Sequence, residues 1–247
     1  MRAVPLETPT PMTLTTPPAT KTKPPKPRNA VATREKILKV ASREFAANGY
    51  DGARVDAIVA KCKISKNLVY HYFDSKEALF TEVMERAYGA MRQRQNDPAL
   101  TGDPVQDMRD LVEQTVQHFI DQPDFHRLLS IENLHKAQHV RKSKVIAEMF
   151  NPLRKALSDT LASGKHQGVF RQDADWVDLY VSISGLGSYF ITNRYTLSYV
   201  LDVDLGTPEW QKARVKHASD VIISYLCHMP VDTGQGASAS LAKPPRR

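Results

Sequence analysis

The sequence predicts an all-α fold of about nine helices: a small N-terminal domain of three helices and a larger C-terminal helical bundle. Apolar residues return every three to four positions in one segment after another, which is the spacing of one helix face. No stretch alternates convincingly between apolar and polar residues, and no internal repeat is visible. With 247 residues the chain is long enough to bury a full hydrophobic core.

Composition places the chain in a broad class. Lys and Arg number 34 against 27 Asp and Glu, a net charge of +7, which favours an anionic partner but only weakly. The two cysteines, Cys62 and Cys227, lie far apart and imply no disulfide framework. Apolar stretches fall short of the ~20 residues of a membrane span, and no continuous apolar segment opens the chain as in a signal peptide. We expect a cytoplasmic protein with no membrane partner.

The composition of both ends of the chain predicts disorder. Residues 1–31 form a basic arm rich in Pro and Thr, with eight of the sixteen prolines in the first 27 residues and Glu7 as the sole acid there. Such a segment cannot bury enough apolar surface to offset its ordering entropy. The arm either touches DNA nearby, as arms of other DNA-binding proteins do, or serves only as a solubilising tail. Residues 231–247, rich in Gly, Ser, Ala and Pro, form a second disordered tail.

The first predicted domain spans residues 32–78. Its first helix starts at Thr33 as N-cap and stops at Asn48-Gly49. A short helix over 55–61 and another beginning at Ser65 follow, and Ser75 caps a long helix that ends near Gln95. The residues expected to point into the core are Ile37, Leu38, Ala41, Phe45, Val55, Ile58, Val59, Val69, Phe73, Ala78, Leu79, Val83 and Met84.

The second predicted domain spans residues 79–230. Helices are expected over 105–120, over a segment opened by Pro123, over 144–162, over 174–193 and over 208–228. Pro152 should kink or break the third of these, because proline lacks an N–H and its ring clashes with the preceding turn. Gly164 and Gly168 are expected to end that helix.

Two short helices joined by a tight turn and flanked by longer ones predict a helix-turn-helix, whose second helix enters the DNA major groove. The charge of this segment agrees. From Arg34 to Lys76, nine basic residues stand against five acids, a net +4 in 43 residues. Phosphate contacts by such groups release counterions and supply much of the affinity for DNA.

At these residues the chain resembles the TetR family of transcription regulators. The resemblance rests on Phe45, Gly49-Tyr50, Val55, Ile58, Ser65, Tyr70, Tyr72-Phe73 and the run Ser75-Lys76-Glu77-Ala78-Leu79. It implies that base edges are read from the start of the recognition helix, that aromatic residues near its end meet phosphate or the groove wall, and that Lys76 binds phosphate at the next helix N-terminus. Phe73 is expected in the core instead. The implied DNA-binding residues are Arg54, Ser65, Lys66, Asn67, Leu68, Tyr70, His71, Tyr72 and Lys76.

Two departures from the family pattern bear on DNA recognition. Lys63 replaces the usual glycine of the turn, at a cost on the order of 1 kcal/mol if the residue must be left-handed. A phosphate contact from this lysine is the second reading. Asn67 replaces another common glycine and can make bidentate contacts to adenine. These changes bear on the operator sequence and leave the DNA-binding role intact.

In similar proteins the C-terminal domain dimerises through its last two long helices and often holds a small effector. Gly185 and Gly187 would let another helix approach closely, although packing within one chain is the alternative reading. The dimerisation candidates are Trp176, Leu186, Tyr189, Trp210, Ile222 and Tyr225.

Effector candidates are polar and aromatic residues that interrupt apolar helices, and Arg127 and Arg194 would suit a carboxylate ligand if they face inward. Glu132, His135 and His139 fall on one face if the helix continues, and two histidines four apart can bind zinc. A solvated face is the preferred reading, a pocket wall the second and a metal site the last, so no metal or cofactor is expected. The effector candidates are Phe125, His126, Arg127, Glu132, His135, Phe150, Tyr180, Asn193 and Arg194.

The resemblance implies a homodimeric repressor that binds a palindromic operator in double-stranded DNA and releases it when a small molecule binds. Phe125-His126-Arg127 and Ile131-Glu132-Asn133 are further similar to regulators of pyrimidine or nicotinate breakdown. An enzyme is disfavoured because no nucleophile elbow, phosphate loop or spaced metal set occurs. An architectural DNA-binding protein driven by the basic arm is the remaining alternative.

Overall fold

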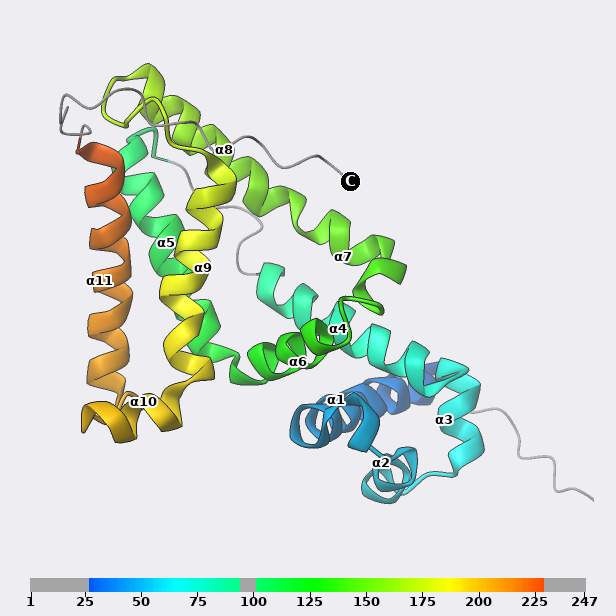
Figure 1. Ribbon diagram of the computed structural model, residues 1–247. Helices are drawn as coiled ribbons and strands as arrows, with labels where there is room; N and C mark the ends of the chain where they lie inside the picture. Colours follow the sequence, from blue (N-terminus) through cyan, green and yellow to red (C-terminus); the bar gives the residue numbers. More distant parts are fainter. Residues whose placement is uncertain (1–26, 94–100, 229–247) are drawn as a thin grey trace, which may run out of the picture.

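The computed structural model describes residues 27–93 and 101–228. Within these ranges the chain forms eleven α-helices, one 3-10 turn and no strand. Figure 1 shows α1, α2 and α3 gathered at one end and α5, α8, α9 and α11 bundled at the other, with α4 and α6 between them. The predicted tail and residues 1–26 of the predicted arm lie outside the described residues.

The first helix, α1 (Pro27–Gly52), begins earlier than the sequence indicated. Thr33 lies inside it, so its assignment as N-cap was wrong, and residues 27–31 of the predicted arm are helical. Proline is tolerated in a first helical turn because the N–H it lacks would have no partner there. Near the other end Gly49 leaves the helical region with φ 72 and ψ 176, at the predicted stop.

Three further helices complete the N-terminal end: α2 (Val55–Cys62), α3 (Lys66–Phe73) and α4 (Lys76–Gln93). The rings of Phe45 and Phe80 meet edge to face with centroids 4.9 Å apart at the centre of this core. Nearly all the predicted inward residues are buried there, while Val59 and Ala78 are half-buried. The same core includes Leu128 and Ile146, so it continues into the C-terminal helices.

The C-terminal helices are α5 (Pro104–Asp121), α6 (Pro123–Leu134), α7 (Lys144–Met149), α8 (Asn151–His166), α9 (Trp176–Thr192), α10 (Arg194–Leu201) and α11 (Pro208–Cys227). Pro152 breaks the predicted helix: α7 ends at Met149, and the proline lies in the first turn of α8. Gly164 does not end α8. It lies within the helix, and it is a glycine there because the ring of Phe170 occupies the space that a Cβ would need.

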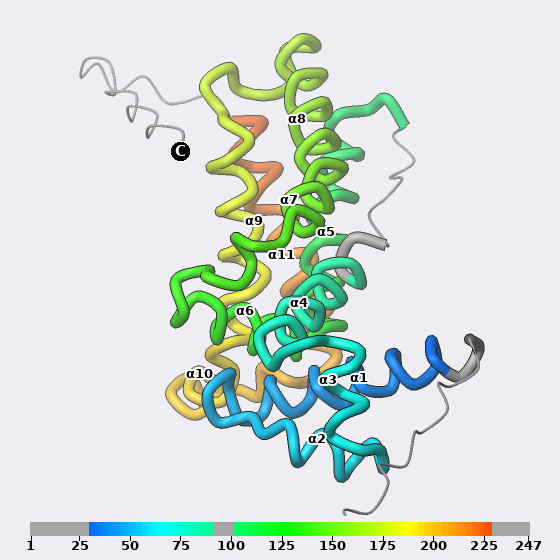
Figure 2. The backbone as a smooth tube through the Cα atoms, turned by 90° about the vertical axis from the view of Figure 1, so that its right-hand side faces the viewer, coloured from blue at the N-terminus to red at the C-terminus, as the bar shows by residue number. Residues whose placement is uncertain are grey.

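The bundle core is formed by α5, α8, α9 and α11, which lie side by side in Figure 2. Gly187 of α9 faces inward, where an added Cβ would meet Val116 and Phe119 at 3.0 Å, so this glycine allows α9 to approach α5 closely. Gly185 has open space beside it. Among the described helices, none is both long and apolar enough to span a bilayer.

Candidate nucleic-acid interface

The turn between α2 and α3 sets the angle of the predicted recognition helix. Lys63 adopts the left-handed conformation, with φ 53 and ψ 49, and its N–H donates to the Ala60 carbonyl at 3.2 Å. Ser65 is extended, and its Oγ accepts the Leu68 N–H at 3.3 Å, which caps α3. Because Lys63 is left-handed, it carries the conformational cost expected for a residue other than glycine at this position.

Helix α3 has one anchored face and one open face. Val69 and Phe73 are buried in the core of the N-terminal helices, and α3 packs against α2 and α4. The exposed residues are Ser65, Lys66, Asn67 and His71, and the half-buried ones are Leu68, Tyr70 and Tyr72. Phe73 is thus a core residue, as expected, and the open face carries the residues predicted to read DNA.

Tyr72 differs from what a phosphate-contacting residue requires. Its hydroxyl is buried and has no hydrogen-bond partner in the described part of the chain. An unpaired buried hydroxyl costs about 1–3 kcal/mol. A contact with phosphate would require the ring to turn outward, so this structure does not present Tyr72 to DNA in the way the sequence indicated.

Lys66 already has a partner at the start of α3. Its Nζ lies 2.9 Å from Oδ1 of Asp56 on α2, and this pairing raises the pKa of the lysine. Both side chains are exposed, and exposed ion pairs contribute little to stability. The lysine can therefore exchange the carboxylate for DNA at small cost.

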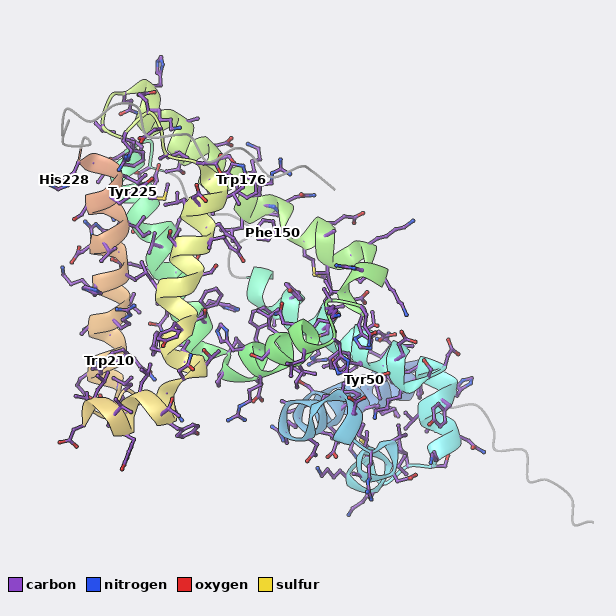
Figure 3. The ribbon with its side chains drawn as sticks, viewed as in Figure 1. Tyr50, Phe150, Trp176, Trp210, Tyr225 and His228 are labelled. Carbon is purple, nitrogen blue, oxygen red and sulfur yellow. The ribbon has the colours of Figure 1, made fainter. Side chains whose placement is uncertain are left out.

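Lys76 stands at the N-terminus of α4. Its Nζ donates to the Asp51 carbonyl at 3.3 Å and lies 5.1 Å from the centre of the Tyr50 ring. Tyr50 in turn contacts His139, with ring centroids 4.5 Å apart. Figure 3 shows Tyr50 where the N-terminal helices meet the segment that follows α6. The lysine is thereby connected through one aromatic ring to the C-terminal domain.

Several basic residues counted toward the phosphate surface act inside the domain instead. Lys36 donates to the Cys62 carbonyl at 3.0 Å, at the C-terminus of α2, and Arg34 pairs with Glu82. Lys61 lies 2.7 Å from Glu44, and its hydrogen bond holds the pKa of that buried carboxyl below its ordinary value. The net charge of +4 therefore overstates the number of cations in this segment that are available to contact DNA.

Other cations of this segment remain available. Arg54 is exposed in the extended N-cap position of α2, and its side chain makes no capping hydrogen bond. Lys39, Arg43 and Lys63 are also exposed. None of these four forms an ion pair within residues 27–93 and 101–228.

The preferred reading of Glu132, His135 and His139 as a solvated helix face was wrong. Helix α6 ends at Leu134, and the chain reverses through Lys136 and Ala137, both with positive φ. Glu132 and His139 are buried. Oε1 of Glu132 accepts the N–H groups of His139 and Val140 at 2.8 Å each, while its Oε2 lies 2.7 Å from His139 Nδ1. The glutamate therefore holds a reversed loop together, and His135 approaches Asp51 instead.

The predicted effector residues do not converge on one site. A cleft of about 420 Å³ between α1, α6 and the junction of α9 with α10 brings together Arg127 and Arg194, and also His126. Phe125 is buried against Tyr88. Phe150 and Tyr180 form an edge-to-face pair beside Trp176, well away from Tyr50 in Figure 3. Asn193 ends α9 by donating to the Tyr189 carbonyl.

The cleft also contains residues that were not among the predicted effector candidates. Ala46 and Gly49 come from α1, and Ser130, Ile191, Thr192 and Tyr195 come from α6, α9 and α10. These residues are up to 149 positions apart in sequence, from 46 to 195, and no local pattern joins them. Only residue type, which singled out the two arginines and His126, gave any signal.

The dimerisation candidates divide by burial. Tyr189 and Tyr225 are 60% and 43% exposed, whereas Ile222 is 2% exposed and belongs to the bundle core, so its assignment to an interface was wrong. Trp176, Leu186 and Trp210 are half-buried, with Trp176 under Arg154 and Trp210 against Phe190. The outer face of α9 presents exposed residues spaced by four, which sequence reasoning had largely missed: Val177, Val181, Gly185 and Tyr189.

Comparisons with known proteins give the same family for the N-terminal and C-terminal parts of the chain. Residues 37–83 match the model for bacterial regulatory proteins of the tetR family, and residues 104–222 match that for the tetracyclin repressor-like C-terminal domain. The HTH-type transcriptional repressor NicS of Pseudomonas putida is 32% identical over 200 residues, covering 81% of this chain and 94% of NicS. The HTH-type transcriptional repressor SCO4008 of Streptomyces coelicolor is 41% identical over 59 residues, 24% of this chain and 31% of that protein. The crystal structure of SCO4942, also from Streptomyces coelicolor, superposes with a TM-score of 0.59 at 27% identity, covering 78% and 98% of the two chains.

Proposed function

Because the chain belongs to the TetR family of helix-turn-helix transcription regulators, we propose that it is a homodimeric repressor that binds a palindromic operator and releases it when a small molecule binds. The observation that carries this proposal is the open face of α3, anchored from behind by Val69 and Phe73. Its exposed Lys66, Asn67 and His71 are the side chains that would enter the major groove. The protein would act in the cytoplasm, where bacterial DNA lies.

Base reading and phosphate binding are assigned to different residues. Asn67 would make the bidentate contact to adenine, and Lys66 would exchange Asp56 for a base edge or a phosphate. Ser65, Leu68 and His71 would line the same groove, with Tyr70 toward its wall, whereas Tyr72 could reach the wall only if its ring turned outward. Arg54 and Lys76 would bind phosphate at the N-termini of α2 and α4, where the helix dipole also favours anions.

The outer faces of α9 and α11 are proposed as the homodimer interface. Val177, Val181 and Tyr189 leave apolar surface uncovered on α9, and Val221 and Tyr225 do so on the neighbouring α11. Contiguous apolar surface of this kind marks interaction sites. A two-fold dimer would place its recognition helices one helical turn apart, about 34–36 Å, and so would read an inverted repeat.

Release of DNA follows from linkage. A ligand that binds one conformer more tightly than the other shifts the population toward that conformer. The factor by which the ligand weakens DNA binding must equal the factor by which DNA weakens ligand binding. The contact from Tyr50 to His139 is one physical connection through which the C-terminal domain can affect Lys76.

The proposal is tested by selecting bound sequences from random duplex DNA with the purified full-length protein at fixed, near-physiological salt. An enriched inverted repeat is expected, bound by two protomers. No enriched sequence, with binding that disappears as salt rises, would contradict the proposal and favour an architectural DNA-binding protein. Repeating the selection without residues 1–26, which leaves α1 intact, separates the two outcomes further, because a repressor keeps its sequence preference.

A further inference from the structure

We infer that the cleft between the DNA-binding helices and the C-terminal domain is the effector site, and that its ligand is a small organic carboxylate that also carries a hydrogen-bond donor. The inference rests on the proposed function and names the ligand class and the place where it acts. The cleft has a volume of about 420 Å³, within the range of small-molecule sites. Its walls belong to both parts of the protein, α1 on one side and α6, α9 and α10 on the other.

The charge of the cleft favours an anion. Arg127 and Arg194 line it against a single acid, Asp124. Arg127 lies 3.6 Å from that aspartate, and Arg194 donates to the Tyr195 hydroxyl at 2.9 Å. Each guanidinium has five N–H donors, so both keep donors for a ligand. The planar arginine fork matches the two oxygens of a carboxylate.

The N-terminus of α6 adds to this preference. Pro123 and Asp124 begin the helix and line the cleft together with His126 and Arg127. Unpaired N–H groups at a helix N-terminus carry partial positive charge and attract anions. Asp124 now occupies the favourable position for negative charge, so it competes with an incoming carboxylate.

His126 indicates the second group on the ligand. Its side chain is 4% exposed, and burial lowers its pKa to about 4, so the ring is neutral at pH 7. The ring hydrogen-bonds to the backbone of Phe119, whereas Nε2 is buried without a partner in the described part of the chain. A neutral imidazole that donates through one nitrogen accepts through the other. His126 also lines the cleft, so Nε2 becomes an acceptor for a hydroxyl or N–H on the ligand once the ring turns toward the cleft.

The position of the cleft connects ligand binding to the DNA-binding helices. Gly49, one of its lining residues, is where α1 leaves helical geometry, and the next residue is Tyr50. Tyr50 lies under Lys76, the proposed phosphate ligand. A molecule that fills the cleft would press on α1 at Gly49, one residue from the Tyr50 ring that supports Lys76, or would hold α1 against α6. Either effect changes the fraction of protein molecules in the conformation that binds DNA.

The test is calorimetric titration of the full-length protein with a panel of small carboxylic acids, each paired with its primary amide. The panel includes 4-hydroxybenzoate, which has a carboxylate and a hydroxyl, benzoate, which lacks the hydroxyl, and 4-hydroxybenzamide, which lacks the charge. At least one acid is expected to bind about tenfold or more tightly than its amide, and hydroxylated acids more tightly than their parent acids. Arg127→Gln and Arg194→Gln should each weaken that acid about tenfold.

Two variants make the result specific. Asp124→Asn should tighten acid binding several-fold, because it removes the competing carboxylate and releases Arg127. Arg141→Gln removes one exposed positive charge outside the cleft and should change nothing. The inference is overturned if no acid binds better than its amide, or if both arginine variants bind the acids as the unaltered protein does. That failure is separate from failure of the repressor proposal, which is decided by the DNA selection alone.

Discussion

Lys63 shows how a single residue can carry a conformational cost where the chain must turn. With φ 53 and ψ 49 it occupies the region that glycine adopts freely and that side chains with a Cβ avoid. We predict that Lys63→Gly raises the free energy of unfolding by about 1 kcal/mol, measured by urea denaturation. Lys63→Ala is the control, since alanine keeps the Cβ and gains nothing. An equal gain in both variants would show that charge, and not backbone strain, was responsible.

His126 makes stability depend on pH. Its pKa is about 4 in the folded protein, against an ordinary value of 6.5, because burial disfavours the charged ring. Its contribution is complete above pH 6.5 and is lost as the pH falls toward 4, since only the unfolded chain takes up the proton in that window. We predict a loss of about 2 kcal/mol between pH 7.5 and pH 5 from this group.

The measurement is the free energy of unfolding at both pH values for the unaltered protein, His126→Gln and His217→Gln. The loss should be smaller by that amount in His126→Gln, which cannot titrate. It should persist in His217→Gln, because that histidine is exposed. Parallel pH profiles in all three proteins would contradict the account.

At the scale of elements, sequence pattern succeeded where structure is local. Ser65 and Ser75 cap α3 and α4 through bonds to the N–H groups of Leu68 and Ala78, three residues along, so sequence alone could place them. Pro152 interrupts a helix by its own chemistry. Helix α10 was missed because it has no buried side chain, and an element without a buried face has no apolar periodicity to detect.

The segment after α6 could not be predicted for a different reason. A helical-spacing argument assumes that the helix continues, whereas Lys136 and Ala137 take up positive φ and reverse the chain. Neither residue type signals such a turn. The buried carboxylate of Glu132 offsets the cost of this reversal, because it accepts hydrogen bonds from the backbone N–H groups of His139 and Val140. The recognition helix was predictable as a continuous motif, but the cleft depends on contacts between distant segments.

Glu132 therefore stabilises the loop that follows α6 and does not belong to an exposed surface. We predict that Glu132→Ala lowers the free energy of unfolding by about 2–4 kcal/mol, since it leaves the buried His139 N–H, the part-buried Val140 N–H and the His139 ring without their acceptor. Glu132→Gln should cost less, because its amide oxygen can still accept both backbone bonds. Thermal and urea denaturation measure this, with the exposed Glu148→Ala as control. Equal effects of the alanine and glutamine variants would assign the stabilisation to charge alone.

At the scale of the whole molecule, two ends of an elongated protein must act together. One hydrophobic core joins α1–α4 to Leu128 of α6 and Ile146 of α7, so the DNA-binding end is packed onto the C-terminal domain and not tethered to it. His139 contacts both Tyr50 and Phe80 across this junction. A change at the cleft can therefore reach α1 and α4 through packed side chains.

Dimerisation also involves the whole molecule, through the exposed apolar row on α9. We predict that Val181→Glu, in the exposed row on α9, converts the dimer to monomer and weakens binding to an inverted repeat by tenfold or more, because a charge would be buried without a partner at the interface. Sedimentation equilibrium measures the oligomeric state. Val145→Glu on α7 places the same charge at another exposed valine and should leave the dimer intact. A Val181→Glu protein that remains dimeric would place the interface elsewhere.

In the proposed dimer, α3 reads DNA symmetrically from two protomers. The most direct test repeats the selection from random duplex DNA with Asn67→Ala beside the unaltered protein. We predict that the inverted repeat survives and loses base preference at one matching position in each half-site, where adenine was required. The same motif from both proteins would show that Asn67 does not read bases, and loss of preference in only one half-site would contradict the two-fold arrangement.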